Sequence, residues 1–181
     1  MKYILILALV CLPLRAANAG TPEQADMAVR IFNTACVANM NLSTEAHADW
    51  AIKAHLERMD KSNEDKLLRH ETGSAWKVSG PIGGFILVFS ASQKCRLIAH
   101  EADTARLKQQ MSGIMDGVKR PELVVEKVKD EDMKAGKGIY NQLTYLVHRP
   151  SENSSFVFIV GTNPDNDEFQ GSLLVSLYTQ P

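Results

Sequence analysis

The spacing of hydrophobic residues changes near residue 72, from a helical period to the patterns of β-strands. Before this point, apolar residues recur every three to four positions. After it, they mostly form short continuous runs or alternate with polar residues. The first spacing is typical of amphipathic helices and the second of strands. The sequence therefore predicts an α+β protein, with most of its helices in the N-terminal part and its strands in the C-terminal part.

Two apolar segments, residues 85–89 and 95–99, enclose a short polar stretch and predict a β-hairpin at the centre of the core. The first segment is continuously apolar, which indicates a strand that is covered on both faces. The register of the hairpin stays open. An even turn places Phe89 opposite Arg96, and an odd, bulged turn places it opposite Leu97.

Three helices are predicted before the hairpin and one after it. Thr21 is a suitable N-cap for the first helix, whose apolar stripe includes Cys36. The second helix is expected over residues 45–59, and a shorter third helix is expected to begin at Ser62. Asp103 is the expected N-cap of the fourth helix.

The other strands are recognised by short runs of strand-forming residues between turn signals. The charged stretch 129–137 is expected to be a loop. Because the strands follow one another across short connections, we expect mostly antiparallel pairing. The prediction is a sheet of about five to seven strands, with N-terminal helices and one further helix packed on it. The expected strands besides the hairpin are residues 75–78, 123–128, 139–147, 156–160 and 172–178.

The first nineteen residues have the composition of a cleaved export signal. Lys2 precedes an apolar segment that is too short to span a membrane as a helix. Ala17-Asn18-Ala19 then has the small-x-small pattern of a cleavage site. Cleavage is expected between Ala19 and Gly20, which leaves residues 20–181 as a single α+β domain in the periplasm or outside the cell. The alternative, a lipid attached to Cys11, has the less suitable local sequence.

The charge of the mature chain argues against one class of partner. Removal of Lys2 and Arg15 leaves 18 basic and 21 acidic residues, for a net charge of −3. Proteins that bind nucleic acid concentrate positive charge, so nucleic acid is not an expected partner. No later apolar run is long enough for a transmembrane helix, so the mature chain is expected to be soluble.

Cys36 and Cys95 are the two cysteines that remain after cleavage. An even pair in an exported protein is usually bridged. Two thiols are too few for a metal site, and no C-x-x-C motif indicates redox catalysis. We expect a structural disulfide that holds the first helix against the central hairpin.

His100, Glu101 and Asp103 are the candidates for catalytic chemistry. They lie where a predicted strand ends and a helix begins, so they could supply a base, an orienting carboxylate or metal ligands. The structural interpretation is that Asp103 caps the helix while His100 and Glu101 face water. No sequence motif supports the catalytic interpretation over the structural one.

Two further groups of residues have simple structural explanations. His47 and His55 lie on one side of the second predicted helix, but eight residues separate them, too many for a shared metal. The loop with Asn163, Asp165 and Asp167 offers oxygen atoms at alternate positions, yet it lacks the glycine and the closing glutamate of a calcium loop. No metal or cofactor is expected.

The sequence favours a non-catalytic binding or interaction protein of the cell envelope, of the partner-binding, inhibitor or immunity type. Its expected partner is a protein or a small ligand. The basis is the export signal, the expected disulfide and the lack of a nucleophile motif. The alternative is a hydrolase or metal-dependent enzyme with a site assembled around His100, Glu101 and Asp103. A third hypothesis is a purely structural component of the envelope.

Overall fold

The computed structural model describes residues 20–40, 43–92, 94–135, 138–164 and 169–179. The predicted export signal lies outside these residues, and so do Asp165 and Asp167 of the calcium-like loop. Helices and strands follow in the order α1 (Pro22–Phe32), the π-helical turn η1 (Asn33–Val37), α2 (Thr44–Lys53), β1 (Glu57–Arg58), α3 (Lys61–Leu68), β2 (Gly73–Gly80), β3 (Gly83–Ser90), β4 (Lys94–Ala99), α4 (Thr104–Val118), β5 (Val124–Ala135), β6 (Gly138–His148), β7 (Ser154–Thr162) and β8 (Gly171–Thr179).

The strands form one eight-stranded sheet in the order β1-β2-β3-β4-β8-β7-β6-β5. Every neighbouring pair is antiparallel. The sheet therefore consists of two meanders, β1–β4 and β5–β8, which are joined where β4 pairs with β8. Helix α4 connects the two meanders, and the α+β class and antiparallel pairing predicted from the sequence are confirmed.

The number of strands exceeds the predicted five to seven because of β1. The sequence placed these residues inside the second helix, but α2 ends at Lys53 and His55 has a φ of 55°. A residue in this left-handed region does not continue a right-handed helix. Leu56 then leads into β1, where Arg58 pairs with Trp76 of β2.

The charged stretch after Val128 was predicted as a loop, and this prediction is wrong. Strand β5 continues to Ala135 and pairs with β6 from Val124 to Ala135, with a shift in register between Lys127 and Lys129. It is an edge strand of the sheet that the described residues form. Charged residues are common on such edge strands because they discourage pairing with other chains.

Neither predicted register of the β3–β4 hairpin is correct. Phe89 lies opposite Cys95, because Ser90 pairs with Lys94. This register differs from the odd one by two residues. A shift of two positions keeps every side chain on its own face of the sheet. The odd register therefore assigns the side chains to the same faces as the structure does, and the even register does not.

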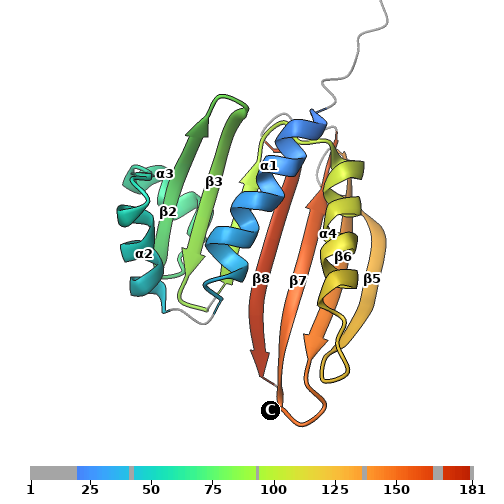
Figure 1. Cartoon of the computed structure of the whole chain (residues 1–181). Helices are drawn as coiled ribbons and strands as arrows, with labels where there is room; N and C mark the ends of the chain where they lie inside the picture. The colour runs from blue at the N-terminus through green and yellow to red at the C-terminus, as the bar shows by residue number, and fades with distance from the viewer. Residues whose placement is uncertain (1–19, 41–42, 93, 136–137, 165–168, 180–181) are drawn as a thin grey trace, which may run out of the picture.

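Three helices cover one face of the sheet, which we call the inner face (Figure 1). Thr21 caps α1 by accepting the backbone N–H of Gln24 at 3.2 Å, and Asp103 caps α4 by accepting that of Arg106 at 2.8 Å. Both predicted caps are confirmed. The helices bury apolar stripes against the sheet: Ala25, Ala28, Val29 and Phe32 of α1, Ala51 of α2, and Leu107, Met111 and Met115 of α4.

Helix α3 packs on the opposite, outer face. Leu68 joins Ala75, Val88 and Ile98 there in a separate small apolar cluster. The N-cap of α3 is Asp60 rather than the region around Ser62 that the sequence suggested, since Asp60 accepts the backbone N–H of Asn63 at 3.1 Å. The outer face thus has its helical cover over β2, β3 and β4.

Cys36 in η1 and Cys95 in β4 form the predicted disulfide, with a Cα–Cα distance of 5.4 Å. Both residues are buried. The bond joins the end of the first helical segment to the middle of the sheet. It therefore fixes the position of η1 over the inner face.

Replacing both cysteines, as Cys36→Ala with Cys95→Ala, should lower the free energy of unfolding by about 4 kcal/mol, because the bond closes a long loop in the unfolded chain. Urea denaturation of the oxidised protein and of the double variant measures the difference. An unchanged denaturation midpoint would contradict a structural role for the disulfide.

Candidate functional site

The residues expected to carry a catalytic site lie at the junction of β4 and α4. His100 and Glu101 are exposed, and the carboxylate of Asp103 is engaged in capping α4. Thr21 forms two backbone hydrogen bonds with this junction. Its N–H donates to the carbonyl of Glu101 at 3.2 Å, and its carbonyl accepts from the N–H of Asp103 at 3.3 Å. The observed contacts anchor the start of α1 to the start of α4.

No metal cluster is present among the residues that the structure describes, taking three or more His, Cys, Asp or Glu side chains as the minimum. His47 and His55 do not share a helix as predicted, because α2 ends between them. His47 is buried and His55 is exposed. Asn163 is buried at the end of β7, where its N–H donates to the carbonyl of Gln170 at 2.9 Å.

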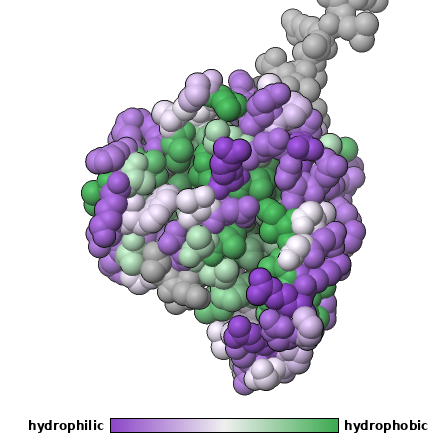
Figure 2. All heavy atoms as spheres, viewed as in Figure 1, coloured by the Kyte–Doolittle hydropathy of each residue, from purple (hydrophilic) through white to green (hydrophobic). Residues whose placement is uncertain are grey.

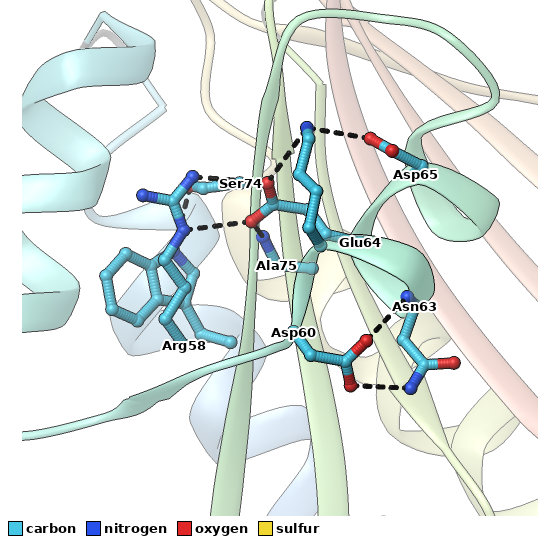
Figure 3. Close-up of polar contacts among 9 residues, drawn as sticks. Arg58, Asp60, Asn63, Glu64, Asp65, Ser74 and Ala75 are labelled. Carbon is cyan, nitrogen blue, oxygen red and sulfur yellow. Dashed lines mark hydrogen bonds and ion pairs between the residues drawn. The ribbon is translucent and has the colours of Figure 1, made fainter.

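A buried carboxylate that the sequence did not reveal lies between α3 and β2 (Figure 3). Glu64 is only 1% exposed. Arg58 donates to both carboxylate oxygens, from Nε at 3.0 Å and from Nη2 at 3.2 Å, and the N–H of Ala75 donates at 3.2 Å. The sequence showed a charge-dense helix that is normally solvated. Nothing in the sequence around Glu64 besides this abundance of charge indicated that its carboxylate is buried.

The electrostatics of Glu64 are those of a structural ion pair. Burial by itself raises the pKa of Glu64, but the hydrogen bonds from Arg58 and Ala75 and the charge of Lys61 outweigh it and lower the pKa. Glu64 is therefore ionised at neutral pH and its oxygens are engaged. The group fastens α3 and β1 to β2, and it is poorly suited to act as a base.

A large hollow with a mostly apolar lining lies on the inner face, beside α4. We call it the α4 cavity, and its volume is 470 Å³. Strands β7 and β8 extend beyond the lower end of α1 in Figure 1, so the helices leave this part of the sheet uncovered. Phe156 and Leu177 lie there and are only half-buried.

The walls of the α4 cavity are mostly apolar and come from both layers of the fold. Figure 2 shows hydrophobic residues gathered between the helices on this face, with hydrophilic residues around them. The apolar lining residues are Val37 and Met40 beside η1, Ile114, Met115 and Val118 of α4, Leu123 before β5, Val147 of β6, Phe156 and Phe158 of β7, and Leu177 of β8.

The polar lining of the α4 cavity comes from one place, the end of β6 and its turn into β7. His148, Arg149, Glu152 and Ser154 lie there. Arg149 and Glu152 are exposed and form an ion pair with an Nη1–Oε1 distance of 2.8 Å. The cavity thus has an apolar interior and a polar rim on one side.

His47 lies next to the α4 cavity and is unusual in its burial. It lines a small hollow together with Met40, Phe156 and Leu177, which also line the α4 cavity. Its ring stacks on Phe89 with centroids 4.5 Å apart, and its Nδ1 is 3.1 Å from the carbonyl oxygen of Ser43.

The protonation of His47 is controlled by this burial. Its Nε2 has no hydrogen-bond partner within the described part of the chain. Burial lowers the pKa of His47, although the carbonyls of Ser43 and Asn39 oppose this effect. The ring is therefore neutral at pH 7 and contributes an aromatic surface to the core.

Replacing Glu64 by glutamine should lower the free energy of unfolding by about 2 kcal/mol, because charge-assisted hydrogen bonds are lost from a buried group. The folded-state pKa of Glu64 lies below the ordinary 4.5. Its stabilisation is therefore present above about pH 4.5 and is lost as the pH falls. Urea denaturation between acidic and neutral pH should show a weaker acid dependence in E64Q.

Glu57→Gln is the control for this experiment, because Glu57 also pairs with a cation but is exposed. Its effect on stability should be small. Equal decreases in the free energy of unfolding for E57Q and E64Q would show that burial of the Glu64 ion pair does not add to stability.

Acid should also destabilise the protein through His47. Its folded-state pKa is depressed below the ordinary 6.5, so the contribution of His47 to stability is complete above about pH 6.5 and falls at lower pH. His47→Phe removes the titration and keeps a ring against Phe89. The dependence of unfolding free energy on pH between neutrality and about pH 5 should become flatter in H47F.

His100→Gln, at an exposed position, should leave that pH dependence as it is in the wild type. If H47F retained the full pH dependence, burial of His47 would not be its source. Chemical denaturation at a series of pH values gives both results.

Comparisons with protein-family models, with curated proteins and with solved structures give no match for this chain. None of the helices in the described residues combines the length and the apolar character that a membrane-spanning helix requires.

Proposed function

We propose that the protein binds a small amphipathic molecule in the α4 cavity. The apolar part of the molecule lies against α4 and the sheet, and its polar end lies at the turn between β6 and β7. The observation that carries the proposal is the 470 Å³ cavity with its apolar interior and one-sided polar rim. Binding sites for small molecules typically measure about 300–1,000 Å³ and have this distribution of polarity.

The chemistry of the rim supports binding and orientation of a ligand. Arg149 and Glu152 present one positive and one negative charge. Both are exposed, so either can exchange its partner for a polar group of the ligand at small cost. His148 and Ser154 add hydrogen-bonding groups beside them. The interior supplies most of the free energy of binding through burial of apolar surface.

This function agrees with the class that the sequence favours, a non-catalytic binding protein of the periplasm or the extracellular space. The lining residues come from six segments of both layers, which describes a site with several walls better than a long surface groove. A small molecule is therefore a better match than an extended peptide. The enzymatic alternative at His100, Glu101 and Asp103 remains a hypothesis without a supporting contact among the described residues.

Two fluorescent naphthalene probes test the proposal. N-phenyl-1-naphthylamine is neutral, and 1-anilinonaphthalene-8-sulfonate has a similar apolar body with an added sulfonate. Both should bind the oxidised wild-type protein and be displaced by medium-chain fatty acids. Ile114→Trp fills the cavity with a larger side chain and should weaken both probes by at least about tenfold, or 1.4 kcal/mol.

Ile52→Trp is the matched control, because Ile52 is 59% exposed and lies outside the cavity. It should leave both affinities unchanged, while Arg149→Gln should weaken the sulfonate probe alone. Near-ultraviolet circular dichroism verifies that each variant keeps its tertiary structure. Equal probe affinities in I114W and the wild type would refute the α4 cavity as the site.

A further inference from the structure

We infer that the outer face of the sheet holds a second site, for a small oxyanion, between Arg96 of β4 and the C-terminal end of α3. We call it the Arg96 site. It lies on the face opposite the α4 cavity and does not depend on the function proposed for that cavity. Its volume is 160 Å³, and its lining residues are Leu67, Leu68, Arg69, Glu71, Val88, Ser90, Arg96 and Leu174.

Arg96 occupies the middle of the outer face. Its neighbours across the sheet are Val88 of β3 and Leu174 of β8, both apolar. Its side chain is half-buried, and its Nη2 donates a hydrogen bond of 2.8 Å to the backbone carbonyl of Leu67. A guanidinium group is thereby held in a fixed position over an apolar floor.

The hydrogen-bonding capacity of Arg96 exceeds what the surrounding groups use. A guanidinium has five N–H donors. Within the described residues, Arg96 donates a side-chain hydrogen bond to the carbonyl of Leu67, while Glu71 and Tyr140 act on it through their charges rather than through hydrogen bonds. Buried charges in proteins are normally paired. The unused donors border the cavity, where an oxyanion can accept two of them side by side.

The surrounding charges also favour an anion. Burial, and next the positive charge of Arg69, lower the pKa of Arg96, while Glu71 acts in the opposite direction. Two arginines and one glutamate line the site, so its formal charge is positive by one. The carboxylate of Glu71 accepts a hydrogen bond from Ser92 Oγ at 2.8 Å. A singly charged anion would make the site neutral.

Tyr140 of β6 lies close enough to Arg96 for their charges to interact. Its ring crosses the sheet over Gly161, where any side chain would collide with it. The hydroxyl group bonds to Ser172, and burial raises the pKa of Tyr140. Tyr140 is therefore neutral at pH 7 and does not act as the counter-ion of Arg96.

The volume of the Arg96 site suits a small anion. A space of 160 Å³ accommodates inorganic phosphate or a short carboxylate. The apolar floor of Val88 and Leu174 can also contact the short chain of a carboxylate.

Isothermal titration calorimetry with inorganic phosphate and with propionate, at constant ionic strength in chloride, tests the Arg96 site. Thermal unfolding with about 20 mM of each anion gives an independent readout, because a ligand of the folded state raises the midpoint. We expect binding of at least one anion by the wild type. The anion that binds with the higher affinity, phosphate or propionate, would identify the class of oxyanion.

Arg96→Met keeps the length of the side chain and should abolish binding of the anion. Arg96→Lys keeps the charge without the planar fork and should weaken binding at least about tenfold. Arg69→Gln changes an exposed lining residue and should weaken binding of the anion. This variant tests the site independently of whether R96M folds. Arg30→Gln, at an exposed position of α1 outside both sites, should bind the anion as the wild type does.

Unchanged binding in R96M and R69Q, or no binding by the wild type at about 50 mM of either anion, would overturn the Arg96 site. Titration of R96M with N-phenyl-1-naphthylamine separates the two sites. The probe should bind R96M as it binds the wild type, because the α4 cavity lies on the other face of the sheet. Loss of probe binding in a folded R96M would show that the two sites are not independent.

Discussion

The pairing of β4 with β8 holds the two halves of the sheet together. It joins the two antiparallel meanders through paired residues from Lys94 with Ser176 to Ala99 with Gly171. Strand β4 also pairs with β3 on its other side. Its alternating side chains then serve both faces: Cys95 anchors η1 on the inner face, and Arg96 points to the outer face. Both proposed sites are bounded by elements that this strand positions.

The second constraint is a mismatch between the sheet and its helical cover. Eight strands present a wide inner face, and α1, α2 and α4 cover only part of it. Where the disulfide holds η1 in place, Val37 and Met40 form one wall of the α4 cavity rather than filling it. A cavity of this size leaves the side chains around it with fewer dispersion contacts, which lowers stability. Binding of an apolar ligand restores such contacts, and this links the fold to the proposed function.

Local signals in the sequence were sufficient for much of the fold. The caps at Thr21 and Asp103 and the seven longer strands follow from patterns that neighbouring residues define. The pairing of Cys36 with Cys95 follows from the cysteine count, because these are the two cysteines left after the predicted cleavage. Strand β1 could not be predicted this way, because only its pairing with β2 makes it a strand. Strand β5 was predicted too short because its charges are compatible with an edge position that the sequence does not specify.

The candidate sites were less predictable than the fold, because each is assembled from distant segments. Glu64 belongs to a charged helix, and its burial depends on Arg58 and on the backbone of Ala75. The α4 cavity combines residues from Val37 to Leu177, and its apolar members resemble the other apolar residues of their own elements. Arg96 interrupts an apolar strand, which was a visible signal, but its surroundings depend on where α3 packs.

Methyl-detected nuclear magnetic resonance of the protein with bound N-phenyl-1-naphthylamine can establish whether the α4 cavity holds the ligand. Intermolecular nuclear Overhauser effects locate a ligand by proximity to individual methyl groups. The account predicts contacts from the aromatic rings of the probe to Ile114, Met115 and Leu177, and none to Ile52. Contacts confined to Ile31 and Leu56, in the smaller groove between α1 and α2, would contradict the assignment of the α4 cavity as the binding site.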